Sequence, residues 1–172
     1  MKTYVALLRA VNVGGTGKLP MAELKAMCEA AGFTQVRTYI ASGNVVFAAK
    51  GTEAQVKAAL EAKLEAYAGK KVGVLVRTPD EMKAVLADNP FPDKAPNRTV
   101  AIFLDKAPPP DAPDKATGLN GEELRPGRRE IYVHYGDGMA DSKLKIPAAA
   151  AGTARNMNTV AKLAGMAAAL EG

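Results

Sequence analysis

The chain has 172 residues, enough for one large or two small domains, and its single cysteine excludes an internal disulfide framework and a four-cysteine zinc site. Apolar residues make up 48% of the chain, and the formal net charge is +5. No apolar run has the form of a signal peptide or approaches the roughly 20 residues that span a bilayer. We therefore expect a soluble cytoplasmic protein that makes no use of a membrane.

The first 77 residues predict the order β-α-β-β-α-β. Pro20 and Gly32 are typical of the start and stop of a helix. Thr52 and Gln55 form a capping box at the start of a second helix. The predicted elements are a strand over 2–8, a helix over 20–31, strands over 35–41 and 44–49, a helix that ends at Gly69, and a strand over 72–77. This order is ferredoxin-like.

The rest of the chain predicts a partial return of the same order. A capping box at Thr78 and Glu81 opens a short helix, and residues 141–151 are ambiguous. The other elements are a strand over 99–104, a short helical segment over 111–117, a hairpin of 122–125 and 130–135, a strand over 152–155, and a final helix capped by Asn156 or Asn158. We expect an α+β protein with a ferredoxin-like half (1–77), a helix and connector (78–98), and a second, partly degraded ferredoxin-like half with a C-terminal helix (99–172).

The charge is unevenly distributed along the chain. Residues 1–22, 30–52 and 142–170 contain no Asp or Glu, although they hold nine of the 23 basic residues. If these segments converge in space, they form a face that attracts anions. The alternative is a chance pattern in an alanine-rich sequence, and the sequence does not decide between the two.

The first acid-free segment contains a glycine-rich loop between a strand and a helix. Glycines let backbone N–H groups face an anion, and a helix N-terminus adds a partial positive charge. The loop is not a P-loop, because Leu19 stands where Ser or Thr would follow Lys18. We interpret it as a ligand-binding loop, with a flexible turn as the alternative. Its candidate residues are Arg9, Asn12, Gly14, Gly15 and Lys18.

The other two acid-free segments supply further candidates. Ser42, Gly43 and Asn44 form a turn by composition, but a fixed amide at Asn44 could also bind a polar ligand. Before the last helix, the residues Arg155, Asn156, Asn158 and Thr159 offer more polar groups than one helix cap requires, and Arg155 has the wrong charge for a helix N-terminus unless an anion lies there. Ser142 and Lys143 are weaker candidates.

The remaining reactive residues favour structural roles. His134 alternates on a strand without a nucleophile-elbow sequence, and Cys28 falls in the apolar stripe of a helix. No spacing of His, Cys, Asp or Glu indicates a metal site. We therefore expect neither a metal nor a cofactor.

Several motifs together resemble a bacterial family known as domain of unknown function 1697. They are Leu8-Arg-Ala-Val-Asn-Val-Gly-Gly15, Pro20-Met-Ala-Glu-Leu24, Tyr39-Ile-Ala-Ser-Gly-Asn-Val-Val-Phe47, Asn89-Pro-Phe91, Ser142-Lys-Leu144 and Thr153-Ala-Arg-Asn-Met-Asn-Thr159. The chain departs from the family in having Met157 where an aromatic residue is usual, and in a shortened helix after Leu144. The resemblance implies an α+β fold of two ferredoxin-like halves and no established activity.

The leading hypothesis is a protein that binds a phosphate-bearing ligand, a nucleotide or a nucleic acid, at a composite basic site. One alternative is a metal-independent phosphohydrolase of the acylphosphatase type, in which Arg9 and Asn44 would be the catalytic pair. Another is a structural or protein-interaction module. The scarcity of aromatic residues (5%) argues against an RNA binder that stacks bases. Oligomeric state cannot be derived from the sequence.

Overall fold

The computed structural model describes residues 1–9, 19–40, 43–136 and 142–171, and it has a mixed α+β architecture. The chain forms two compact units, residues 1–82 with 163–172 (unit 1) and residues 83–162 (unit 2). Two four-stranded antiparallel sheets and four α-helices make up the regular structure of the described residues. The domain boundaries predicted at residues 77 and 98 stay a prediction.

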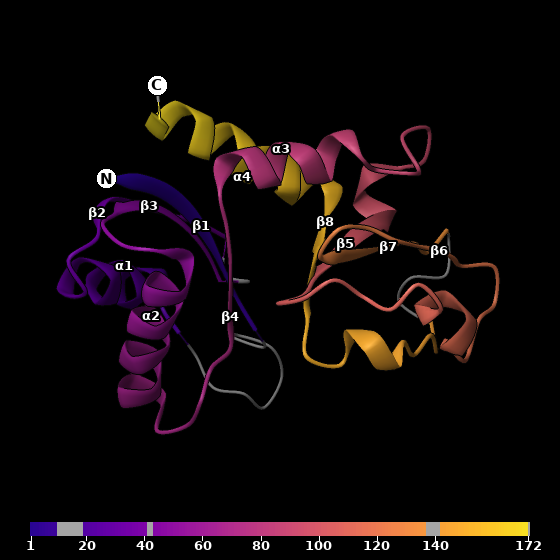
Figure 1. Ribbon diagram of the computed structural model, residues 1–172, viewed down its shortest axis with the longest axis horizontal. Coiled ribbons are helices and arrows are strands. Elements are labelled where there is room, and N and C mark those ends of the chain that lie inside the picture. Colours follow the sequence, from indigo (N-terminus) through magenta and orange to yellow (C-terminus); the bar gives the residue numbers. More distant parts are fainter. Residues whose placement is uncertain (10–18, 41–42, 137–141, 172) are drawn as a thin grey trace. The chain divides into compact units, whose positions relative to one another are not determined.

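Unit 1 is built on the sheet β2-β3-β1-β4, in which every neighbouring pair is antiparallel. Figure 1 shows α1 and α2 together on one side of this sheet. The element order β-α-β-β-α-β is the one that the sequence predicts. The bounds are β1 (Lys2–Leu8), α1 (Met21–Ala30), β2 (Thr34–Tyr39), β3 (Asn44–Ala49), α2 (Glu53–Ala68) and β4 (Val74–Arg77).

The core of unit 1 lies between the sheet and the two helices. Tyr4, Ala6 and Leu8 point from β1 into this core, where Phe47 stacks on Phe33 at 4.3 Å between ring centroids. Residues of α1 and α2 with helical spacing complete it, including Leu24, Met27, Cys28, Val56, Leu60 and Leu64. Val5 and Leu7, on the opposite side of the strand, are also fully buried. The continuous apolar run of β1 therefore reflects burial on both faces of the sheet.

The two helices predicted from capping boxes begin where the sequence places them, while α1 begins at Met21, one residue after the predicted Pro20, which is its extended N-cap. Thr52 accepts a hydrogen bond from the Gln55 amide at 3.2 Å, and the Gln55 side chain accepts one from the Thr52 amide at 2.9 Å. Thr78 and Glu81 make the same reciprocal pair at the start of α3 (Pro79–Ala87). These capping boxes satisfy amide groups that have no partner within the helix.

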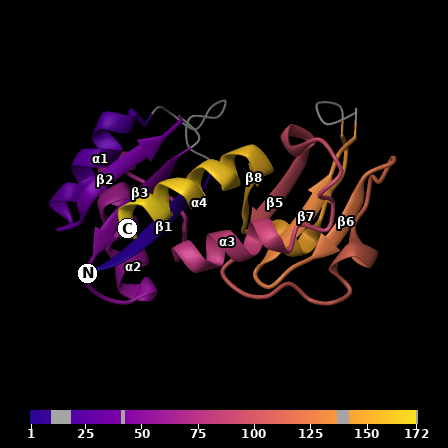
Figure 2. The ribbon, with the colours of Figure 1, turned by 90° about the horizontal axis from the view of Figure 1, so that it is seen from above.

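Unit 2 contains the sheet β6-β7-β5-β8, again antiparallel throughout. Figure 2 shows its strands with the short helical turns beside them. Here the predicted helical segments are single 3-10 turns, at η2 (Ala112–Lys115) and η4 (Pro147–Ala149), with prolines at Pro113 and Pro147. The other elements are η1 (Pro96–Arg98), β5 (Thr99–Phe103), β6 (Glu123–Pro126), β7 (Glu130–His134), β8 (Thr153–Asn156) and α4 (Met157–Glu171), whose residues from Leu163 onward belong to unit 1.

The core of unit 2 packs one face of its sheet against these turns. Val100, Ile102 and Ile131 are buried on this face, with Ala112 of η2 and with partly buried Ala148 of η4. Two short turns thus cover the face that α1 and α2 cover in unit 1, as expected for a segment too short and too rich in proline for an α-helix. Among the described residues, no helix has both the length and the apolar character needed to cross a membrane.

Candidate functional site

Arg9 directly follows β1, at the end of the unit 1 sheet where β1 ends and β3 and β4 begin. The Leu8 amide donates to the Gly43 carbonyl at 2.9 Å, which ties the end of β1 to the start of β3. The Arg9 amide donates to the Gly73 carbonyl, also at 2.9 Å, on the other side. The backbone of Arg9 is therefore fixed between the segments that begin β3 and β4. We call the group Arg9, Gly43, Asn44 and Gly73 the strand-end rim.

The side chain of Arg9 lies over Gly73. A Cβ atom built on Gly73 would stand 3.1 Å from Cδ of Arg9, which is tighter than most van der Waals contacts, and at an ordinary 3.6 Å from Cγ. Gly73 has no positive φ, so glycine is favoured here by the close approach of Arg9 and not by its backbone conformation. No local pattern in the sequence marks Gly73, because its partner Arg9 is distant along the chain.

Asn44 is fully buried at the first position of β3. Its Nδ2 donates to the Tyr39 carbonyl at 2.9 Å across the β2–β3 hairpin. Ile40 and Gly43, within the connection, both have positive φ values, 50° and 89°. The amide nitrogen of Asn44 thus serves the hairpin connection, which is the turn interpretation of this segment.

Five predicted site residues lie outside the described residues, so the structure places none of them. They are Asn12, Gly14, Gly15, Lys18 and Ser42. Of the candidates in unit 1, Arg9, Gly43 and Asn44 are described, and the pairing of β1 with β3 brings these three together.

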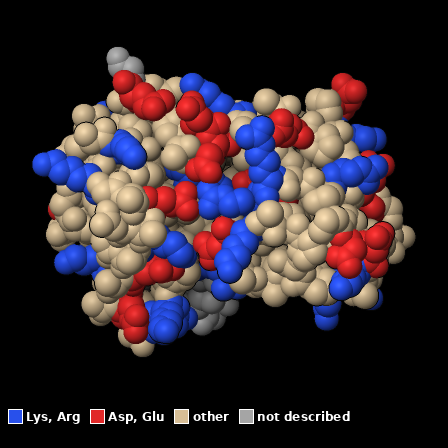
Figure 3. Space-filling model, in the orientation of Figure 1, with Lys and Arg blue, Asp and Glu red and all other residues tan. Residues whose placement is uncertain are grey.

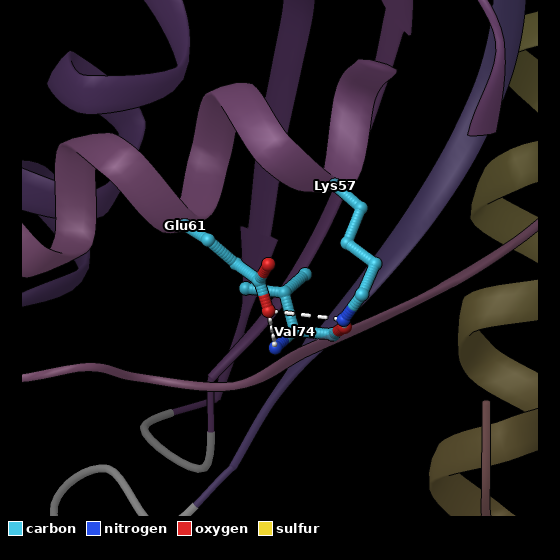
Figure 4. Close-up of polar contacts among 3 residues, drawn as sticks. All are labelled: Lys57, Glu61 and Val74. Carbon is cyan, nitrogen blue, oxygen red and sulfur yellow. Dashed lines mark hydrogen bonds and ion pairs between the residues drawn. The ribbon is translucent and has the colours of Figure 1, made fainter. Parts of the chain in front are cut away.

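A charged pair on α2 binds the backbone of β4 next to the strand-end rim (Figure 4). Lys57 Nζ donates to Glu61 Oε2 at 2.9 Å and to the Val74 carbonyl at 2.5 Å. The same oxygen of Glu61 accepts the Val74 amide at 3.1 Å. Val74 follows Gly73 directly, so this pair fixes the strand on which the Arg9 side chain rests. The i,i+4 spacing of Lys57 and Glu61 is visible in the sequence, but Val74 as their common partner is not.

Arg155 is buried in β8 of unit 2, with 6% of its surface exposed. One guanidinium nitrogen donates to Thr153 Oγ1 at 2.7 Å and to the Ala154 carbonyl at 2.9 Å. Burial lowers the pKa of Arg155 to about 10, because the low-polarity surroundings disfavour the charged form. Since that value is well above 7, the side chain remains cationic at neutral pH.

The residues that follow Arg155 begin the last helix. Asn156 Oδ1 accepts the Thr159 amide at 2.9 Å, so Asn156 is the helix cap. Asn158 is exposed on the first turn, and Thr159 is buried with 6% of its surface exposed. Of the two asparagines proposed as caps, the first therefore fills that role.

Ser142 and its neighbours close a loop of unit 2. The Ser142 hydroxyl donates to Glu122 Oε2 and accepts the Leu144 amide at 3.2 Å, while Lys143 is exposed. The hydrogen bond from Ser142, followed by backbone hydrogen bonds, lowers the pKa of Glu122. Both hydrogen-bonding capacities of this hydroxyl are thus used within the loop.

The described candidates fall into both units. Arg9, Gly43 and Asn44 belong to unit 1, while Ser142, Lys143 and residues 155–159 belong to unit 2. Within unit 2, Arg155, Asn156 and Thr159 lie together at the junction of β8 and α4. The convergence of all three acid-free segments on one site stays a prediction.

The remaining reactive groups have structural surroundings. Burial raises the pKa of the Cys28 thiol to about 12. His134 Nδ1 lies 3.0 Å from the Thr99 hydroxyl, and the His134 ring packs near Phe91. No group of three His, Cys, Asp or Glu side chains within the described part of the chain could hold a metal ion.

Basic and acidic side chains are interspersed over the face drawn in Figure 3. In unit 1 the acidic residues follow a simple rule, because all eight lie in helices and the four strands carry none. They are Glu23, Glu29, Glu53, Glu61, Glu65, Asp80, Glu81 and Glu171. The strands of this sheet therefore carry no negative side chain, and the acidic residues of unit 1 are confined to its helices.

Comparison with known proteins supports the fold and the family. The chain is similar over 98% of its length to the conserved bacterial protein SP0830 from Streptococcus pneumoniae, of which it covers 99%, with a TM-score of 0.80 and 25% sequence identity. No curated protein matches the chain. Residues 1–132 match the model of the family described as "Protein of unknown function (DUF1697)". The chain belongs to this family, which confirms the resemblance found in its motifs.

Proposed function

We propose that this member of the DUF1697 family binds a phosphate-bearing ligand, a nucleotide or a nucleic acid, with Arg9 as the main cationic contact. One observation carries the proposal: the backbone of Arg9 is held on both sides, by Gly73 and through Leu8 by Gly43, at a rim where the strands end. Because this backbone is already fixed, binding an anion at Arg9 does not have to order it, so less of the contact energy is lost to backbone conformational entropy.

The distribution of charge supports the same proposal. The four strands β1–β4 themselves contain no acidic residue, because the acidic residues of unit 1 lie in its helices. Glu61 of α2 does approach the neighbouring Val74, but its Oε2 atom is bonded to Lys57 and to the Val74 amide. That carboxylate oxygen is thus locally neutralised, which supports a site for an anion at the rim.

In the composite form of this proposal, Arg155 is the second cation, and Lys18, Lys143 and the polar groups of Asn12, Ser42, Asn156 and Asn158 shape the pocket. The charge of Arg155 at neutral pH supports its part, because a buried guanidinium gains strongly from an anionic partner. Asn156 contributes through the helix that it caps, since anions are stabilised near helix N-termini.

The proposal is tested by recording amide spectra of the 15N-labelled chain during titration with inorganic phosphate, adenosine triphosphate and a short single-stranded RNA. We expect saturable shifts at Arg9, Gly43 and Gly73 with at least one of these probes. RNA binding should weaken steeply as salt is added, because neutralised phosphates release counterions. If none of the three probes shifts these residues, the proposal is wrong.

A phosphohydrolase is the second candidate. The strand order β2-β3-β1-β4 and an arginine directly after β1 favour a ferredoxin-like unit of the acylphosphatase kind. Against it, Asn44 is buried and its amide nitrogen bonds the Tyr39 carbonyl, so this group does not serve to orient water in the arrangement described. Hydrolysis of an acyl phosphate that Arg9→Ala abolishes would favour this function. Turnover that survives the substitution would exclude Arg9 as its catalytic residue.

A structural or protein-interaction module is the third candidate, and the same titrations separate it from the others. Such a module would show neither saturable binding of the three phosphate-bearing probes nor turnover of an acyl phosphate.

A further inference from the structure

On three of the four edge strands of the two sheets, an arginine side chain hydrogen-bonds to the backbone of its own strand. Arg77 on β4, Arg125 on β6 and Arg155 on β8 each donate from a guanidinium nitrogen to the carbonyl of the preceding residue. The distances are 3.0, 2.6 and 2.9 Å. All three strands are at the ends of the strand orders β2-β3-β1-β4 and β6-β7-β5-β8, so the same contact recurs at three sheet edges.

The covered carbonyls are those that point away from the sheet. In an antiparallel pair, residues alternate between facing the neighbouring strand and facing away from it. The Arg9 amide donates a hydrogen bond to the Gly73 carbonyl, which fixes the alternation along β4. The backbone N–H and C=O groups of Leu75 and Arg77 therefore point toward β1, and those of Val74 and Val76 point away from the sheet. The Arg77 guanidinium donates to the carbonyl of Val76. Lys57 donates to the carbonyl of Val74, and Glu61 accepts from its amide (Figure 4). Both outward residues of this strand are thus bonded by side chains.

The two edges of the unit 2 sheet follow the same rule. The Leu104 amide donates a hydrogen bond to the Arg129 carbonyl, which fixes the alternation between β5 and β7. Followed across the sheet, the same alternation directs the backbone N–H and C=O groups of Ala154 on β8 and of Leu124 on β6 away from their neighbouring strands. These are the residues whose carbonyls Arg155 and Arg125 bond. Pro126, the other outward residue of β6, has no amide hydrogen to offer. Unpaired edges attract strands of other chains, and side-chain bonds or proline remove that attraction.

Strand β2 is the exception. The hydrogen bond between Leu8 and Gly43 means that the backbone groups of Asn44 and Val46 on β3 point toward β2. Their partners Tyr39 and Arg37 point back toward β3, so the backbone N–H and C=O groups of Thr38 point away from the sheet. Within the described residues, the outward amide and carbonyl of Thr38 have no hydrogen-bond partner. A register shift between Thr34 and Arg37 limits the regular part of this edge to residues 37–39.

We propose that the outer edge of β2 at residues 37–39 is an interaction surface that accepts an extended acidic peptide segment as an added strand. The charge decides the occupant. Arg37 is exposed, and no Asp or Glu occurs between residues 30 and 52. A second copy paired about Thr38 would place two Arg37 side chains diagonally on one face, about 7–8 Å apart, and like charges at such positions repel. An acidic side chain at that position would attract Arg37 instead.

The test is a titration of the 15N-labelled chain with a blocked hexapeptide of alternating threonine and glutamate. Binding should shift the amides of residues 37–39 and slow hydrogen exchange at Thr38, and it should leave Leu124 on the covered edge β6 unchanged. The matching threonine–lysine peptide should bind about fivefold more weakly, because an opposite-charge cross-strand pair contributes up to about 1 kcal/mol. Shifts at Leu124 of the same size as those at Thr38, or equal binding of the lysine peptide, would overturn the proposal.

Two modified reagents separate strand addition from charge attraction alone. Thr38→Pro removes the outward amide hydrogen, and an acidic peptide that is N-methylated at alternate residues lacks its own donors. Each should reduce the affinity about five- to tenfold, the worth of one to two hydrogen bonds. The methylated peptide needs no change in the protein, so it decides the outcome even if Thr38→Pro does not fold. Full affinity of the methylated peptide would contradict strand addition.

Discussion

The side chain of Arg9 rests on Gly73, with Cδ of Arg9 at 3.1 Å from the position that a Cβ of residue 73 would occupy. The amide of Arg9 bonds the carbonyl of the same glycine at 2.9 Å. One residue thus positions both the backbone and the side chain of the cation on which the proposed anion site depends.

Gly73→Ala should therefore displace Arg9 and weaken anion binding, while the fold remains intact. The new methyl group meets the flexible part of the arginine chain and not backbone, so we expect a stability loss of no more than about 1 kcal/mol. Gly165→Ala is the matched control, since nothing lies within 4 Å of its added Cβ, and alanine in a helix should raise stability by about 0.5–1 kcal/mol. Chemical denaturation and phosphate titration of both variants check this. Unchanged binding in Gly73→Ala would show that the Arg9 position does not matter.

Gly118 marks a close approach in unit 2. A Cβ there would lie 2.1 Å from the Lys143 carbonyl oxygen, and its φ is +76°. Gly121 has a φ of +90° with nothing within 4 Å. Gly118→Ala should therefore cost clearly more stability than Gly121→Ala, which carries only the left-handed backbone penalty of about 1–2 kcal/mol. Equal melting temperatures for the two variants would mean that the loop at Lys143 moves aside freely.

The Cys28 thiol makes stability depend on alkaline pH. Burial raises its pKa from 9.0 to about 12, so the folded chain keeps a proton that the unfolded chain loses. This contribution is complete below pH 9 and is lost as pH rises toward 12, at up to about 1.4 kcal/mol per pH unit. Cys28→Ala removes it, so its unfolding free energy should fall less steeply than that of the parent between pH 9 and 11. Parallel curves would contradict the assignment.

Ser142 should control the acidity of Glu122. Its hydrogen bond is the largest of the effects that lower the Glu122 pKa. A lowered pKa stabilises the folded state above the ordinary value near 4.5, and this stabilisation is lost as pH falls through the lowered value. Ser142→Ala should move the Glu122 pKa upward in an NMR titration of the side-chain carboxyl carbons. An unchanged Glu122 pKa in this variant would contradict the role of Ser142.

Much of the fold could be predicted from the sequence, because its signals are local. The pairs Thr52–Gln55 and Thr78–Glu81 lie within one helical turn, so the capping boxes were readable and are confirmed. The prediction that the segment near Pro147 falls short of a full helix is also confirmed, since only the 3-10 turn Pro147–Ala149 forms there. Proline at that point limits the helix for a local reason.

The site was less predictable, because its contacts depend on strand pairing. Nothing local connects Arg9 to Gly73 until β1 pairs with β4, or the pair Lys57 and Glu61 to Val74 until α2 packs beside β4. The hydrogen bond from Arg155 to the carbonyl of Ala154 likewise depends on the position of β8 at a sheet edge, which local sequence does not reveal. Charge patterns along a sequence indicate which residues could meet an anion, but the pairing of the strands decides which of them do.

The central claim is that Arg9 binds an anion at the strand-end rim, and calorimetric titration of adenosine triphosphate into the chain and into Arg9→Gln tests it most directly. Lys50→Gln is the control, because Lys50 lies in an acid-free segment just beyond the opposite end of β3, about 20 Å from Asn44 by strand length. We predict that Arg9→Gln weakens binding at least tenfold, in keeping with about 1.5–3 kcal/mol for a charged hydrogen bond, and that Lys50→Gln changes it less than twofold. Equal affinities of the parent and Arg9→Gln, or an equal loss in both variants, would contradict the claim.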